Sequence, residues 1–106
     1  IFKDIKNVNF FDNLNDDFFC NYWLNTLLLE TKEEKESLRL ALEESNIESR
    51  PLWKPMHMQP VFEKYPYYGF KIAEELFQKG LCLPSGSNLT DKDKSRIKKV
   101  IINFFK

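Results

Sequence analysis

Apolar positions change their spacing along the chain, and the spacing predicts a strand, a helix and a second strand in succession. The nearly continuous apolar run at 21–30 is typical of a strand that is buried on both faces. Thr31, with Glu34 three residues later, is typical of a helix N-terminus, and this helix should end near residue 45. Residues 47–53 return to an extended pattern, so the two strands should be neighbours or near-neighbours joined by a crossover. The apolar stripe expected along the helix consists of Leu38, Leu40, Ala41 and Leu42.

The second half of the chain predicts an ordered loop, a short helix, a brief strand and a final helix. Three prolines interrupt residues 54–68, yet many aromatic side chains there favour an ordered loop. A helix follows near 72–79 and ends at Gly80, and residues 81–84 form a strand. The last helix begins at Thr90, and residues 7–11 predict one further strand. Together these elements predict a single α+β domain over residues 1–106, a small sheet with helices packed on one face.

Composition excludes several classes of function. Sixteen basic residues balance sixteen acidic ones in 106 residues, which disfavours a nucleic-acid partner or an anionic membrane surface. The apolar runs are too short to cross a bilayer, so we expect a cytoplasmic protein without a membrane partner. With one histidine and two separated cysteines, Cys20 and Cys82, we expect no metal site, and we expect both thiols to be reduced.

The candidate functional side chains are concentrated in residues 49–60, where polar residues are interspersed with prolines. Arg50 and Lys54 suit a phosphate or carboxylate, and His57 could donate to an oxyanion or move a proton. Simpler roles are open for each: a surface ion pair for the two cations, and a hydrogen bond that braces the loop for the histidine. The substrate-binding residues that we predict are Arg50, Lys54, His57 and Gln59.

Three separated stretches resemble the carboxy-terminal part of the DegT/DnrJ/StrS sugar aminotransferases. They read Asn-Tyr-Trp-Leu at 21–24, Ser-Arg-Pro-Leu-Trp-Lys-Pro-Met-His-Met-Gln-Pro at 49–60, and Gly-Leu-Cys-Leu-Pro-Ser-Gly-Ser-Asn-Leu-Thr at 80–90. Their order and approximate spacing also match that family, and the resemblance covers the chain from Asn21 onward. Met58, where leucine is common, and the poorly matching residues 10–20 depart from the pattern.

The resemblance implies the small domain of a fold type I aminotransferase. In such enzymes a large domain holds pyridoxal phosphate as a Schiff base on a lysine, which lies upstream, so Lys54 is not that lysine. We therefore expect no catalytic, cofactor-binding or metal-binding residue in this chain, and no activity from it alone. The whole protein would be a homodimer that transfers an amino group, usually from glutamate, to a nucleotide-linked keto-sugar for surface polysaccharide. The Trp-Lys-Pro-Met-His sequence favours a UDP-sugar.

The alternative is a stand-alone α+β binding or interaction module without catalysis. The two hypotheses differ in whether a cofactor domain precedes Ile1, and the absence of an initiator Met favours the enzyme. If such a domain covers this one, the present chain should expose apolar surface. The residues expected in that surface are Phe10, Phe11, Phe18 and Phe19.

Overall fold

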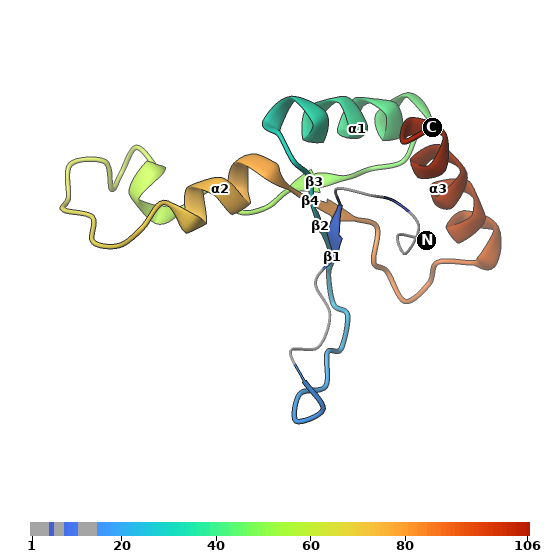
Figure 1. The fold of residues 1–106 in the computed structure, drawn as a ribbon, viewed down its shortest axis with the longest axis horizontal. Helices are drawn as coiled ribbons and strands as arrows, with labels where there is room; N and C mark the ends of the chain where they lie inside the picture. Colours follow the sequence, from blue (N-terminus) through green and yellow to red (C-terminus); the bar gives the residue numbers. More distant parts are fainter. Residues whose placement is uncertain (1–4, 6–7, 11–14) are drawn as a thin grey trace.

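A four-stranded antiparallel sheet lies at the centre of the fold (Figure 1). The computed structural model describes residue 5, residues 8–10 and residues 15–106. The strand order is β1-β2-β4-β3, so β2 and β4 are the inner strands. In chain order the elements are β1 (Asn9–Phe10), β2 (Asn25–Leu28), α1 (Lys32–Glu44), β3 (Arg50–Pro51), the 3₁₀ helix η1 (Met56–Met58), α2 (Ile72–Lys79), β4 (Gly80–Leu83) and α3 (Asp91–Phe104).

The core lies between one face of this sheet and the helices α1 and α3. Leu27 and Leu81 are paired across the inner strands, and both are fully buried. Because side chains alternate along a strand, these leucines share a face with Leu29 and Leu83. The predicted α+β class, with helices packed on one face of a small sheet, is confirmed. The buried cluster consists of Leu27, Leu29, Leu38, Leu42, Ile47, Leu81, Leu83 and Ile101.

Both predicted crossover strands exist, but they are shorter than the pattern indicated. The backbone of Tyr22 is left-handed at a φ of 50°, and the Asn21 side chain accepts a hydrogen bond from the Trp23 amide, so β2 begins only at Asn25. β3 is limited to two residues at the sheet edge, where Pro51 cannot donate to a further strand. The two strands are near-neighbours as predicted, since β4 lies between them and is antiparallel to both.

Helix α1 begins where the sequence predicted, but its buried stripe is different. Thr31 accepts a hydrogen bond from the Glu34 amide at 3.0 Å, and the Glu34 carboxylate accepts one from the Glu30 amide. Leu40 is 45% exposed, so its prediction as a core residue was wrong. Its place on the inner face is taken by Lys35, whose stem is buried and whose ammonium lies 5.8 Å from the centroid of the Phe77 ring.

The other two helices begin and end near the predicted residues. Thr90 and Asp93 form a reciprocal capping box at the start of α3. Gly80 ends α2, as predicted, with ordinary extended dihedrals, φ −87° and ψ 138°. The glycine is required by space, because a Cβ there would lie 2.2 Å from Cδ1 of Leu52 and 2.4 Å from the carbonyl oxygen of Leu76.

Two segments project from this body, as Figure 1 shows: the connection that leads into β2, and the loop 54–71 that leads into α2. The radius of gyration is 15.5 Å, against about 13 Å for a compact chain of this length. Phe18 and Phe19 in the first projection are 56% and 91% exposed, and Phe10 in β1 is 37% exposed, which confirms the expectation for these three. Phe11, and the residues at either end of the predicted strand 7–11, lie outside the described residues. Within the described ranges, none of the helices combines the length and apolar character needed to cross a bilayer.

Candidate functional site

The loop 54–71, which we call the projecting loop, carries three of the four predicted site residues. It leaves the edge strand β3, turns through η1, and returns to the sheet through α2 and β4 (Figure 1). Pro55 precedes η1, and the backbone amide of Met58 donates to its carbonyl at 3.0 Å. The Gln59 side-chain amide donates to the carbonyl oxygen of Lys54 at 3.2 Å, which ties the two ends of η1 together. The prolines and these bonds make the segment an ordered loop, as predicted.

His57 lies at the inner side of this loop and connects it to α2. Its Nε2 is 3.1 Å from Oε1 of Glu74, in the first turn of α2. Its ring is stacked on Tyr67 with centroids 3.7 Å apart and planes at 24°. The Tyr67 hydroxyl in turn donates to the carbonyl oxygen of Phe70 at 2.7 Å. The histidine therefore does brace the loop, and its side chain is still 19% exposed.

Arg50 and Lys54 lie on the surface, and their side chains are held by fewer contacts than that of His57. Arg50 donates through Nε to Glu48 at 2.8 Å and forms an ion pair with it, but both side chains are more than two-thirds exposed. Such an exposed pair is worth at most about 1 kcal/mol, so an anionic ligand could displace the glutamate. The ammonium of Lys54 is exposed, and within the described part of the chain it forms no hydrogen bond or ion pair.

The structure brings part of the predicted set together. Gln59 contacts Lys54 through the backbone, and His57 lies between them in the same short helix region. Among the described residues, no hydrogen bond or ion pair links Arg50 to the other three. Sequence reasoning missed Glu74, which follows His57 by 17 residues and shares no local motif with it.

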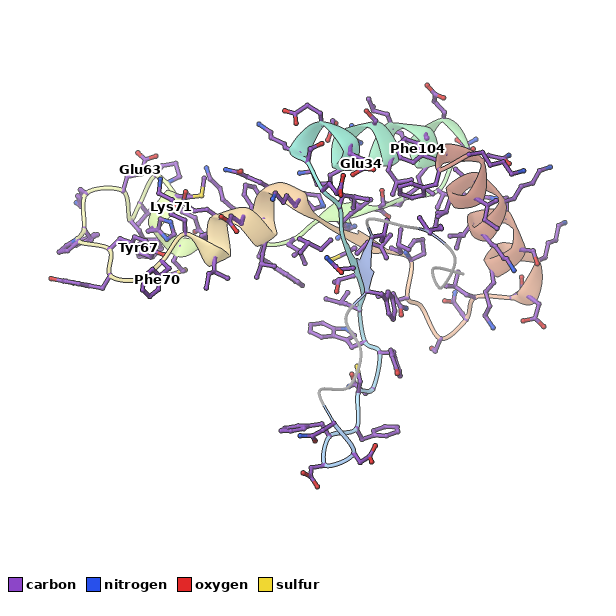
Figure 2. All side chains as sticks on the ribbon, viewed as in Figure 1. Glu34, Glu63, Tyr67, Phe70, Lys71 and Phe104 are labelled. Atoms are coloured by element: carbon purple, nitrogen blue, oxygen red, sulfur yellow. The ribbon has the colours of Figure 1, made fainter. Side chains whose placement is uncertain are left out.

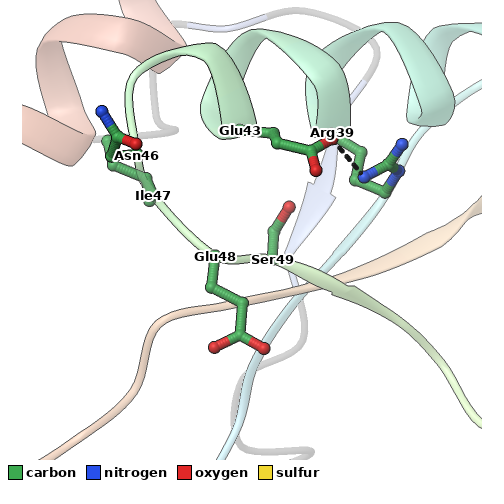
Figure 3. Close-up of a pocket in the computed structure, with 6 residues that line it drawn as sticks. All are labelled: Arg39, Glu43, Asn46, Ile47, Glu48 and Ser49. Carbon is green, nitrogen blue, oxygen red and sulfur yellow. Dashed lines mark hydrogen bonds and ion pairs between the residues drawn. The ribbon is translucent and has the colours of Figure 1, made fainter.

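A concave region lies between α1 and the segment that leads into β3 (Figure 3). It encloses about 330 Å³, and the Ser49 hydroxyl lining it is buried without a hydrogen-bond partner among the described residues. Its one guanidinium, that of Arg39, is already held by Glu36 and Glu43 at 2.7 and 2.8 Å. The hydrogen bond from Arg39 lowers the pKa of the Glu36 carboxyl, and these carboxylates raise the pKa of Arg39 further. Arg39 is thus already paired with two carboxylates, whose negative charge disfavours binding of a further anion in this cleft.

The remaining reactive groups do not form a site. Cys82 is a reduced thiol, as predicted, and burial raises the pKa of this thiol. The sulfur of Cys20 accepts a hydrogen bond from the Tyr22 amide at 3.4 Å. Within residue 5, residues 8–10 and residues 15–106, no three His, Cys, Asp or Glu side chains converge as metal ligands would. The projecting loop is therefore the strongest candidate site in the described structure.

A model of the DegT/DnrJ/EryC1/StrS aminotransferase family matches residues 1–102. The chain belongs to this family. The match includes β3, the whole projecting loop and the β4 strand that follows it. The resemblance noted in the three sequence stretches is thereby confirmed, and the family is one of aminotransferases.

Two relatives and one solved structure illustrate the similarity. EpsN of Bacillus subtilis, named as a candidate pyridoxal phosphate-dependent aminotransferase, is 42% identical over 89 residues, 80% of this chain and 23% of EpsN. GDP-perosamine synthase of Escherichia coli O157:H7 is 38% identical over 90 residues, 84% of this chain and 24% of the synthase. The aminotransferase PseC of Helicobacter pylori shares the fold, with a TM-score of 0.80 at 21% identity over 98% of this chain and 29% of PseC. The chain thus spans about a quarter of these relatives' length.

The described residues do not fit a pyridoxal phosphate site. Such a site needs a lysine amine for the Schiff base beside groups that hold the phosphate and ring. Lys54 is exposed, and the ammonium of the buried Lys35 lies against the Phe77 ring. Neither amine forms an ion pair in the described part of the chain, and neither is placed beside groups that would hold a phosphate. We therefore assign no step of cofactor chemistry to these residues.

Proposed function

We propose that this chain is the small domain of a pyridoxal phosphate-dependent aminotransferase that acts on a nucleotide-linked keto-sugar. The observation that carries the proposal is the 42% identity with EpsN over 89 residues, together with the family match over residues 1–102. Both favour the enzyme over a stand-alone binding module, because the identity covers most of the chain. Pyridoxal phosphate supplies the electron sink for amino transfer. We place its lysine in another domain.

In this proposal the chain contributes contacts to the substrate rather than to the cofactor. Arg50 and Lys54 bind the negatively charged diphosphate of the nucleotide sugar, since both cations are exposed and neither is held by a buried partner. His57 and Gln59 bind its polar groups from the braced η1 turn. Trp53, which is 69% exposed beside Lys54, adds apolar surface next to them. The active site is then completed when the projecting loop docks against the cofactor domain.

The finer features of the activity are parts of the same proposal. The Trp-Lys-Pro-Met-His sequence favours a UDP-sugar, whereas the name of the Escherichia coli relative specifies GDP-perosamine. Glutamate as amino donor, a homodimer, a cytoplasmic location and a role in surface polysaccharide stay predictions. The aromatic side chains of the projections, among them Phe19 and Tyr68, which are 91% and 88% exposed, are suited to be covered by a cofactor domain.

The proposal is tested on the longest protein that carries this chain. We would measure amino transfer from glutamate to UDP-linked and GDP-linked keto-sugars, and detect the amino sugar by mass spectrometry. Arg50→Ala and Lys54→Ala should each raise the KM for the sugar nucleotide roughly tenfold or more, because each removes a charge-assisted hydrogen bond to phosphate. Lys64→Ala, which removes another exposed lysine from the same loop, is the matched control and should leave KM unchanged. Absence of transfer to every keto-sugar nucleotide would refute the proposal.

A further inference from the structure

The contacts of His57 constrain both the position of its ring and the position of its proton. Nε2 lies 3.1 Å from Oε1 of Glu74, while the ring is stacked on Tyr67 at a centroid distance of 3.7 Å. Tyr67 is itself fixed by the bond from its hydroxyl to the Phe70 carbonyl. Figure 2 shows Tyr67 and Phe70 together on the projecting loop, far from Phe104 on α3. The imidazole is thus held on one face by an aromatic ring and at one nitrogen by a carboxylate.

The carboxylate determines which nitrogen carries the proton in the neutral imidazole. An ionised glutamate only accepts hydrogen bonds, so Nε2 must donate to it and therefore holds the proton. Nδ1 is then left with a lone pair and acts as an acceptor. No hydrogen bond to Nδ1 is formed within the described part of the chain, and the His57 side chain is 19% exposed. Nδ1 is consequently the ring atom that remains for a ligand.

We propose that Glu74 and Tyr67 are positioning residues for His57, which presents Nδ1 as a hydrogen-bond acceptor to a hydroxyl group of the sugar substrate. A sugar hydroxyl can donate to a lone pair, whereas a fully ionised phosphate cannot, so the acceptor at Nδ1 favours the sugar over the diphosphate. The proposal rests on the proposed function, because it assigns an atom and a substrate group to one of the predicted contacts. Glu74 acts only through His57, and Tyr67 fixes the plane of its ring.

Nitrogen NMR of the ring tests the positioning step without relying on activity. We would label the longest protein that carries this chain with ¹⁵N-histidine and assign the His57 signals by their loss in His57→Gln. The wild type should show a protonated Nε2 and an unprotonated Nδ1 at a pH where the ring is neutral. Glu74→Gln keeps the size of the side chain but removes the acceptor-only carboxylate, so the tautomer preference should be lost. Glu75→Gln, on the exposed neighbour in the same helix turn, is the matched control and should preserve it.

Steady-state kinetics then test the substrate assignment. Glu74→Gln should raise the KM for the keto-sugar nucleotide roughly tenfold, the loss of about one hydrogen bond, and should leave the KM for the amino donor unchanged. Tyr67→Phe, which retains the stacked ring, should be milder than Tyr67→Leu. A proton on Nδ1 in the wild type, or equal KM values for the Glu74→Gln and Glu75→Gln proteins, would overturn the proposal. If the wild type transfers no amino group at all, the proposed function fails and the hydroxyl assignment fails with it, while the tautomer measurement still decides the role of Glu74.

Discussion

Replacing Gly80 with alanine should loosen the base of the projecting loop. Gly80 lies where α2 meets β4, and its amide donates to the carbonyl of Leu76. The new methyl group would lie 2.2 Å from Cδ1 of Leu52 and 2.4 Å from the Leu76 carbonyl oxygen, far inside the 3.0 Å that real Cβ atoms respect. The Leu52 methyl can rotate away, but the carbonyl belongs to the backbone of α2. The backbone at the junction of α2 and β4 must therefore shift.

The cost can be worked out from the two opposing effects. Overpacking of a tight site costs about 1–3 kcal/mol, whereas the loss of glycine entropy in the unfolded chain returns about 0.4–1 kcal/mol. The middle of each range gives a net loss of about 1.3 kcal/mol for Gly80→Ala. Gly86→Ala is the matched control, since its methyl group would meet only the side chain of Asn88, with the oxygen at 2.5 Å, and this exposed side chain can rotate. This control should be neutral or slightly stabilising.

Urea unfolding followed by circular dichroism gives the free-energy difference between the two variants, provided that the slope with urea is unchanged. Hydrogen exchange locates the effect: peptides from residues 72–83 should exchange faster in Gly80→Ala than in Gly86→Ala, because the contact that changes is the junction of α2 and β4. Equal stability and equal exchange in the two variants would refute the packing argument at Gly80.

Three further predictions concern the helices. Leu38→Ala should lower the unfolding free energy by about 2–5 kcal/mol, because Leu38 is fully buried. Leu40→Ala should change it by less than about 0.5 kcal/mol, because Leu40 is 45% exposed. Urea unfolding of both variants checks this prediction, and equal losses would contradict it. Thr90→Ala should cost about 1 kcal/mol through loss of the α3 cap. Hydrogen bonds from Thr90 lower the pKa of the Asp93 carboxyl from its ordinary value of 3.8, so Asp93 stabilises the fold above that value and the contribution is lost as the pH falls through the folded pKa. The difference in unfolding free energy between wild type and Asp93→Asn should therefore shrink in acid, and a difference that grows there would contradict the assignment.

Local signals in the sequence were enough to predict the helices and the order of the elements. Thr31 and Thr90 cap helices because each has an acidic residue three positions later, and this relation is contained within one helical turn. The apolar run at 21–30 likewise predicted that its strand is central, whereas the central place of β4 was not predicted. What failed were the strand lengths, since the turn at Asn21–Trp23 depends on the left-handed backbone of Tyr22, an uncommon conformation for a tyrosine.

Relations across the fold could not be predicted in this way. Lys35 is buried, and its ammonium lies 5.8 Å from the centroid of the Phe77 ring of a different helix; a lysine in a charged run carries no sign of such a neighbour. The same holds for the site. The sequence singled out His57 and Gln59 from their proline-rich surroundings, but the pairing of His57 with Glu74 exists only because the projecting loop folds back on α2. The substrate contacts of Arg50, Lys54, His57 and Gln59 stay predictions.

The absorption spectrum of the longest protein that carries this chain tests the central claim most directly. A sugar aminotransferase should purify with an absorption band from bound pyridoxal phosphate, which falls when glutamate is added and returns when a nucleotide-linked keto-sugar follows. That cycle would establish amino transfer and its two substrates in one cuvette. A protein that binds no pyridoxal phosphate, or whose band responds to neither substrate, would contradict the account and favour a binding module built on the same fold.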